Sequence, residues 1–344
     1  MAAPEASEAA KPPKRRRFAI DVLDVGLARV LALLGTLGTS VIVARVLGPE
    51  GNGLIAALTV VPFLVVTFAE LGTRQATTFY LGKGVHAPEA ITSALVVLFL
   101  ASSLIGIAIC AAYFWATWDA HLTLAAVIGA SALLPLALVK NYATGIFLGL
   151  ERVGLFARIN WLPAATYFAG LAGLALAGAL SATTAVMAQA AGLALVAAYA
   201  VFQVVRHGPW RWRLEWPVVI ALVRLGLVYA TALFLITLNY RANVLLLREW
   251  SSLEQVGLYV VGANIAQLIW QVPGTMSAVV LSRSANARDD RAFTDKIGVL
   301  VRLSVLLGAL GAAGLAMIGL LAIPLIYGLD FARSALVLAC LLPG

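Results

Sequence analysis

The chain has 344 residues, of which 62% are hydrophobic and only 12% are Asp, Glu, Lys or Arg, and its mean hydropathy is +0.96. Soluble domains usually carry about 25% charged residues, so this composition argues against a soluble enzyme, a nucleic-acid-binding protein or a disordered chain. We interpret the net charge of +8 as a signal of membrane orientation and not of nucleic-acid binding. Long unbroken apolar runs, unlike the alternating segments of a β-barrel, predict an all-α polytopic membrane protein.

The chain begins with a polar tail, residues 1–20, which includes the basic run 14–17. No small-residue cleavage site follows a short apolar core, so we expect a cytoplasmic tail and a retained first helix. One membrane crossing needs about 20 apolar residues. The sequence predicts about ten spans: residues 25–46, 54–76, 90–115, 122–148, 161–180, 184–205, 218–248, 256–281, 297–321 and a tenth beginning near 334.

Lys and Arg residues gather in alternate connections between these spans, as in 14–17, 206–213 and 283–296. Cytoplasmic loops of membrane proteins carry such an excess. We therefore expect a multi-pass protein whose N-terminus is cytoplasmic.

A short internal echo indicates two halves. The second span opens with Gly53-Leu54 and the eighth with Gly257-Leu258, each followed by an apolar run. If this match marks a repeat, the second half begins near Pro217. The expected domains are the tail 1–20, a first six-helix lobe 21–205, a cytoplasmic linker 206–216 and a second lobe 217–344. The tenth span stops after about ten residues, too few to cross, so we expect this lobe to be incomplete and the chain to be truncated.

No set of residues suggests catalysis. The sequence contains no nucleophile–base grouping, no metal-ligand cluster and no phosphate-binding glycine loop with lysine. We therefore predict no catalytic residue, no metal and no cofactor, and a protein that is not an enzyme. Glycines 308, 311 and 314 are expected to allow close helix packing.

Basic side chains inside the predicted spans are the most informative feature, because a charge in hydrocarbon normally faces a cavity or a partner. They are Arg29, Lys140, Arg224 and Arg241. Glu70 is the one clear acid among the spans, and its spacing from Arg74 favours a local i,i+4 ion pair. If the four basic residues share a cavity, its potential is positive and it suits an anion such as a phosphate or diphosphate group.

Amide side chains form a second polar set. Asn239 and Asn243 flank Arg241 in the seventh span, while Asn264, Gln267 and Gln271 follow i, i+3, i+7 spacing and share one stripe of the eighth. The stripe is equally consistent with hydrogen bonds between helices and with a polar wall that faces sugar hydroxyls.

Several ordered segments resemble the polysaccharide-biosynthesis flippases of the Wzx type, which belong to the multidrug/oligosaccharidyl-lipid/polysaccharide (MOP) exporter superfamily. The resemblance runs from about residue 20 to 344. The segments that carry it include 44–54, 70–72, 77–81, 148–152, 239–246, 255–259 and 324–331.

The resemblance implies roughly 12 to 14 helices in two pseudo-repeated lobes around a basic central cavity that works by alternating access. The implied function is a flippase that moves polyprenyl-diphosphate-linked oligosaccharide across the bacterial cytoplasmic membrane. The implied partners are this lipid-linked substrate, membrane lipids, a polysaccharide polymerase and glycosyltransferases. Arg241 stands where the family often has a basic residue, whereas Asn243 stands where many members have Asp.

Two alternatives remain. A drug/cation antiporter of the same superfamily should place acidic groups in its cavity, whereas here basic residues prevail among the spans. A membrane glycan polymerase or ligase should carry a large outer loop, which the sequence lacks.

Overall fold

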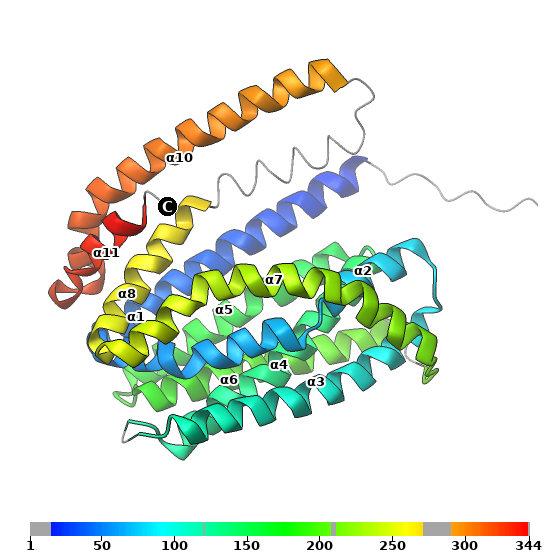
Figure 1. Ribbon diagram of the computed structural model, residues 1–344, viewed down its shortest axis with the longest axis horizontal. Coiled ribbons are helices and arrows are strands. Elements are labelled where there is room, and N and C mark those ends of the chain that lie inside the picture. Colours follow the sequence, from blue (N-terminus) through cyan, green and yellow to red (C-terminus); the bar gives the residue numbers. More distant parts are fainter. Residues whose placement is uncertain (1–14, 120, 208–210, 271–289, 343–344) are drawn as a thin grey trace, which may run out of the picture.

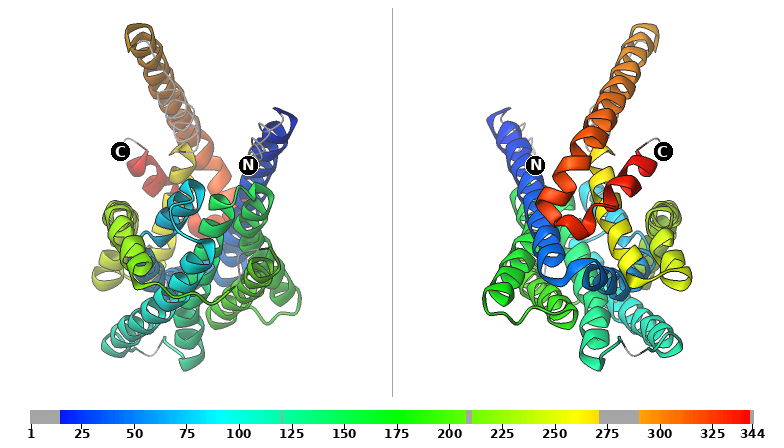
Figure 2. Two further views of the ribbon diagram at one scale, coloured as in Figure 1. Left: turned by 90° about the vertical axis from the view of Figure 1, so that its right-hand side faces the viewer. Right: turned by 90° about the vertical axis from the view of Figure 1, so that its left-hand side faces the viewer.

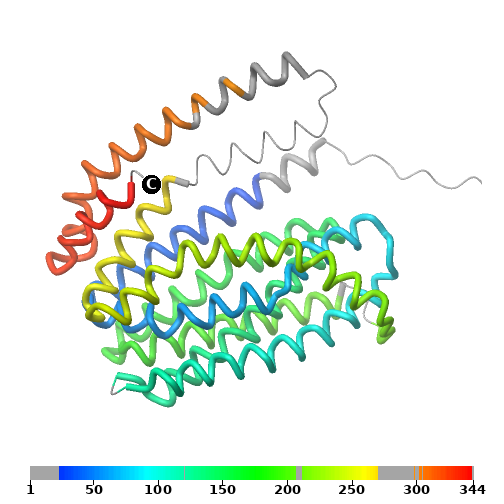
Figure 3. Tube along the Cα trace, in the orientation of Figure 1, coloured from blue at the N-terminus to red at the C-terminus, as the bar shows by residue number. Residues whose placement is uncertain are grey.

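The computed structural model describes residues 15–119, 121–207, 211–270 and 290–342, and these contain helices and turns but no strand. Most of the helices run roughly side by side in one bundle, and the N-terminal part of α10 stands away from it (Figures 1 and 3). Their bounds are α1 Arg15–Ala69, α2 Thr73–Lys83, α3 Pro88–Ala116, α4 Leu124–Gly149, α5 Val153–Leu176, α6 Ala182–His207, α7 Trp216–Trp250, α8 Leu253–Ala266, η1 Gln267–Trp270, α10 Asp290–Tyr327, η2 Leu329–Phe331 and α11 Ser334–Leu341.

Seven of the described helices are long and apolar enough to cross a membrane, and Leu253–Ile269 is a shorter apolar helix. The all-α polytopic prediction is therefore confirmed. One of the seven, Leu23–Lys83, has 61 residues, which is long enough to cross twice. The chain changes direction within it, at the kink of α1 at Gly48. The predicted spans 25–46 and 54–76 are its two arms. The end of the predicted eighth span, residues 271–281, lies outside the described residues, and Gln271 with it.

Gly48 makes the sharp turn in α1 because its backbone adopts φ 66° and ψ −172°, a combination that only glycine adopts readily. Pro49 follows at once and cannot donate a backbone hydrogen bond to the preceding arm. The turn between the first two spans is thus encoded locally in the Leu47–Gly53 segment.

A second break, between α1 and α2, interrupts the predicted span 54–76. Leu71 and Gly72 both have positive φ, 51° and 59°. A Cβ on Gly72 would overlap the backbone of Gly226 in α7, and a Cβ on Gly226 would overlap the carbonyl oxygen of Leu71. The break therefore lets two backbones touch where α2 crosses α7.

The predicted separation of the fifth and sixth spans, 161–180 and 184–205, is confirmed, since α5 ends at Leu176 and α6 begins at Ala182. Ser181 and Thr184 cap α6 reciprocally: the Thr184 backbone N–H donates to Ser181 Oγ at 3.1 Å, and the Ser181 N–H donates to Thr184 Oγ1 at 2.8 Å. Two of the helix's free N–H groups are satisfied in this way.

The largest apolar core joins α1 to α6 with the start of α7, and its fully buried members include Leu134, Phe147 and Leu222. A smaller core links α1 with α8, α10 and α11 around Val261, Ile323 and Phe331. Helix α7 thus packs on the first six helices. The division into lobes at 206–216 stays a prediction.

The two segments of the internal echo meet in space. A Cβ on Gly53 would overlap the Leu253 carbonyl oxygen, and a Cβ on Gly257 would overlap the Pro49 carbonyl oxygen. Pro49 precedes Gly53 by four residues, just as Leu253 precedes Gly257, so the contact is reciprocal. The α1–α8 crossing behaves as the centre of an approximate two-fold relation, with Asn52 Nδ2 donating to the Gly257 carbonyl at 3.1 Å.

Several long helices end on the same side of the molecule. The first arm of α1, α3, α7 and α10 finish there, and α8 begins there (Figure 1). From this end, α10 and the first arm of α1 diverge toward their N-termini (Figure 2). We call the end at which they meet the convergent end.

Candidate functional site

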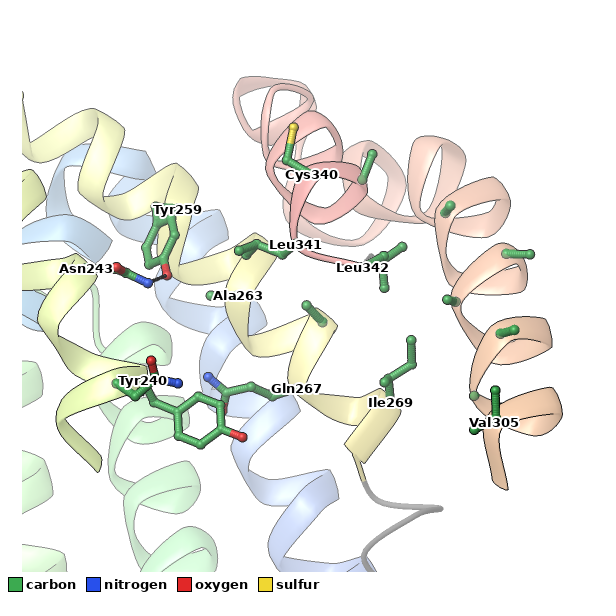
Figure 4. A pocket seen from close by; sticks show the side chains of 18 residues that line it. Tyr240, Asn243, Tyr259, Ala263, Gln267, Ile269, Val305, Cys340, Leu341 and Leu342 are labelled. Carbon is green, nitrogen blue, oxygen red and sulfur yellow. Dashed lines mark hydrogen bonds between the residues drawn. The ribbon is translucent and has the colours of Figure 1, made fainter. Parts of the chain in front are cut away.

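A cavity of about 1060 Å³ lies between α7 and α8 on one side and α10 and α11 on the other (Figure 4). Small side chains on one face of α10 make room for it, because Gly308, Ala309, Ala312, Ala313 and Ala316 recur at helical spacing. Its remaining apolar lining comes from Ala263, Ala266, Ile269, Val305, Ala339, Cys340, Leu341 and Leu342.

The glycines of α10 do not serve the close packing expected from the sequence. A Cβ on Gly308 or Gly314 would meet no atom within 4 Å, and one on Gly311 would only reach Ile269 at 4.0 Å. Of the three glycines, Gly308 lines the cavity, together with the neighbouring alanines of α10.

The polar part of the wall comes from α7, α8 and η1. It consists of Asn239, Tyr240, Asn243, Tyr259 and Gln267. Asn243 Nδ2 donates a 2.8 Å hydrogen bond to the Tyr259 hydroxyl, which fixes the two helices' side chains relative to each other (Figure 4). Among the described residues that line the cavity, none is Asp, Glu, Lys, Arg or His.

This wall can bind through neutral hydrogen bonds. Amides supply both donors and acceptors, and tyrosine adds a hydroxyl and an aromatic face. An unpaired charge in such surroundings is unfavourable. The cavity therefore suits an uncharged polar group with many hydroxyls.

Three of the amides named from the sequence, Asn239, Asn243 and Gln267, are brought together in the cavity. Asn264 is exposed on α8 and is not among the lining residues. Gln271 lies outside the described residues. Of the stripe residues that the structure describes, Gln267 in η1 lines the wall and Asn264 does not, and neither Tyr240 nor Tyr259 was among the predicted site residues.

The four basic residues do not gather at this cavity. Arg29 lies exposed on the first arm of α1, Arg224 lies exposed on α7, and Lys140 is half-buried on α4. Arg241 places its Cζ 6.0 Å from the centre of the Phe63 ring. None of the four is among the residues that line this cavity, and a cavity shared by the four stays a prediction.

The position of Arg241 follows from helix geometry. Successive residues turn by about 100°, so Asn239 and Asn243 lie close to one face of α7 while Arg241 points nearly the opposite way. The side chain stacks on Phe63 in the second arm of α1 instead of joining its two neighbours at the cavity. The three residues are neighbours in sequence, but the helical turn places Arg241 on a different face of α7 from Asn239 and Asn243.

Lys140 belongs to a charged cluster in the first six helices. Glu70 is buried and Arg74 Nε lies 3.4 Å from its Oε1, which confirms the expected i,i+4 ion pair. Asn141 Nδ2 donates to Glu70 Oε2 at 2.7 Å, and Lys140 lies within electrostatic range of the same carboxylate. The cluster ties the end of α1 to α4, a long-range contact that the sequence did not indicate.

Two further arginines make long-range contacts that were also missed. Arg45 donates from Nε to the Ile326 carbonyl at 2.8 Å and from Nη2 to the Leu325 carbonyl. Arg248 Nη1 donates to the Tyr113 hydroxyl at 2.8 Å. Both lie at ends of predicted spans, where an arginine is usually assigned to the lipid headgroups.

Comparison with known proteins now gives the family. A family model described as "Polysaccharide biosynthesis protein" matches residues 23–281, well over half of the chain. No curated protein matches the sequence significantly.

The fold is similar to that of a solved structure described as the inward-facing conformation of a multidrug resistance MATE family transporter of the MOP superfamily. The TM-score is 0.63 at 14% identity, and the match covers 93% of this chain and 79% of the other. At this identity the likeness concerns the fold. With its apolar helices and the family match, the chain is a multi-pass membrane protein that has the MATE-like fold and belongs to the polysaccharide biosynthesis protein family.

Proposed function

We propose that this protein is a flippase that moves a polyprenyl-diphosphate-linked oligosaccharide across the bacterial cytoplasmic membrane by alternating access. The observation that carries the proposal is the uncharged amide–tyrosine wall of the large cavity in a membrane protein of a polysaccharide-synthesis family. Sugar hydroxyls need many neutral donors and acceptors, which this wall supplies.

The cavity is large enough for a short oligosaccharide. Pockets for drug-sized ligands have volumes of roughly 300–1,000 Å³. At about 1060 Å³ the cavity reaches the top of that range, so several sugar units fit better than one ion. Asn239, Asn243 and Gln267 are the proposed saccharide-binding residues, and Tyr240 and Tyr259 join them.

The basic residues have a weaker place in this proposal. Diphosphate would need cations, and none of Arg29, Lys140, Arg224 and Arg241 lines this cavity. We propose that the saccharide is the part of the substrate that the cavity selects. The N-terminus is cytoplasmic in this proposal, on the strength of the Lys and Arg distribution, and no chemical step is involved.

The wider setting follows from the proposed substrate. Its glycan must be assembled on the lipid by glycosyltransferases before transport and consumed afterwards by a polysaccharide polymerase. These enzymes, together with membrane lipids, are the proposed partners.

The test replaces the polar wall. In cells whose own copy of the gene is deleted, the variant N239L/Q267L is expected to reduce surface polysaccharide at least about fivefold, because each lost hydrogen bond contributes about 0.5–1.5 kcal/mol and two amides of the wall become apolar. The readout is glycan staining of whole cells, normalised to the amount of variant protein in the membrane.

Asn160→Leu is the matched control. Asn160 is an exposed amide on α5 that bonds its own helix, from Nδ2 to the Phe156 carbonyl at 2.8 Å. The control variant should leave surface polysaccharide unchanged. Full export by N239L/Q267L would remove the cavity from the mechanism, and drug efflux by the purified protein in vesicles would favour the antiporter instead.

A further inference from the structure

Arg248 connects the C-terminal end of α7 to the C-terminal end of α3. Its Nη1 donates to the Tyr113 hydroxyl at 2.8 Å, and its guanidinium carbon lies 5.6 Å from the centre of the Tyr113 ring. Its Nη2 lies 3.7 Å from Asp119 Oδ2, just beyond α3. The Arg248 side chain is only 9% exposed, so these three contacts define its surroundings.

Arg45 makes an equivalent connection from the first arm of α1 to the end of α10. Its guanidinium donates to the carbonyl oxygens of Leu325 and Ile326. The last carbonyls of a helix have no partner within the helix, and the helix dipole favours a cation beside them. The end of α10 is thus capped by a side chain far away in sequence.

The two arginines are related by the approximate two-fold symmetry of the α1–α8 crossing. The interval from Gly53 to Gly257, added to Arg45, gives Glu249, the residue after Arg248. The same interval carries the whole of α3 into α10. Arg45 lies on the first arm of α1, before Gly53, and contacts α10. Arg248 lies on α7, before Gly257, and contacts α3. Each arginine therefore joins the first helix of one half to the third long helix of the other half.

Both contacts lie at the convergent end of the bundle, from which α10 and the first arm of α1 diverge (Figures 1 and 2). The other contacts between the halves near the crossing are the backbone contact with the Asn52–Gly257 hydrogen bond beside it, and apolar packing such as that around Val261 and Ile323. Such contacts carry little charge-dependent energy, whereas hydrogen bonds to charged groups are stronger.

We propose that Arg45 and Arg248 are a pair of equivalent latches that hold the convergent end closed, and that both must release before the cavity can open at that end. The purpose of the latches rests on the transport function proposed above. The latches themselves are tested by conformation and not by export, so a failure of one proposal is distinguishable from a failure of the other.

The experiment measures the distance across the convergent end. Spin labels replace Trp118, after α3, and Leu329, after α10, both of which are exposed. The background is the full chain with C110A and C340A, reconstituted in lipid nanodiscs. The double variant R45Q/R248Q keeps much of the side-chain size and loses both charges. It is expected to increase the long-distance population at least about threefold over the parent in pulsed electron resonance. The two single variants should give increases that are similar to each other and smaller than that of the double variant.

R213Q is the matched control, because Arg213 forms an exposed ion pair with Glu215 close by in sequence. It should leave the distance distribution unchanged. A double variant with the parent's distribution would overturn the proposal.

A second comparison tests the same claim if the double variant does not fold. In the R45Q background, R248D should increase the long-distance population over that of R45Q alone, because the introduced carboxylate would face that of Asp119, and D119R/R248D in the same background should restore the R45Q distribution by reversing the ion pair. Restoration supports the Arg248 latch. A population that stays raised in D119R/R248D, or that R248D does not raise, contradicts it.

Discussion

Asn141 Nδ2 lies 2.7 Å from Glu70 Oε2, and this hydrogen bond joins α4 to the end of α1. Glu70 sits where α1 breaks at Leu71 and Gly72, so its carboxylate is held next to Arg74 on the following helix. With Lys140 also in range, one buried carboxylate compensates two cations. The cluster is therefore stable only while the anion is present and hydrogen-bonded.

The first prediction concerns Asn141→Leu. The change removes a donor from a buried carboxylate and should lower the free energy of unfolding by about 1–3 kcal/mol. Thermal unfolding of the purified protein in detergent, followed by tryptophan fluorescence, measures the loss. N160L is the control, since Asn160 is exposed. Equal stability of N141L and the parent would mean that the Glu70 contact contributes nothing.

The second prediction contrasts two glycines. Gly257→Ala would place a methyl group on the Pro49 carbonyl oxygen and must push α8 away from α1, so we expect a loss of about 1–3 kcal/mol. Gly308→Ala has no atom within 4 Å of the new Cβ and should instead stabilise α10 by about 0.4–1 kcal/mol through the unfolded chain. Unfolding in increasing denaturant measures both. The same sign for the two variants would contradict the packing described.

The course of the helices was predictable from the sequence, whereas the site was predictable only in part. A run of about 20 apolar residues is a local property, and caps such as Ser181 and Thr184 or turns such as Gly48 are encoded within a few residues. The predicted spans therefore match most of the described helices, whereas 161–180 begins eight residues after α5 begins at Val153. The break at Gly72 was missed because its cause is the backbone of Gly226, far along the chain.

The site needed information on how helices face one another. The cavity amides Asn239 and Asn243 could be named, because polar groups in apolar spans are informative by themselves. That Arg241 points away from them was available from helix periodicity, but its partner Phe63 was not. The contact of Arg45 with α10 joins segments that are far apart in sequence and are brought together only by tertiary packing. No local sequence pattern predicts such a contact.

The third prediction follows from the position of Arg241. Arg241→Gln should destabilise the protein by about 0.5–1 kcal/mol through the lost cation–π contact. It should leave export normal once expression is matched, because the residue does not line the cavity. A double-mutant cycle with Phe63→Leu measures the coupling. A large loss of export by R241Q with unchanged stability would return Arg241 to a direct role in substrate binding.

The fourth prediction uses the two cysteines as a natural pair of reporters. Cys340 is exposed and lines the cavity, whereas Cys110 is fully buried in the first core. A membrane-impermeant thiol reagent needs water at the sulfur, so it should label the native protein at one cysteine per chain, and C340A should abolish the labelling while C110A leaves it unchanged. Mass spectrometry of the intact protein counts the adducts.

Cys340 lies among Ala339, Leu341 and Leu342 in an apolar part of the wall. Labelling of Cys340 therefore requires water throughout the cavity and not only at its polar side. An unlabelled Cys340 in the native protein, with labelling restored by denaturation, would mean a dry cavity and would leave the amide–tyrosine wall without an aqueous path for a saccharide.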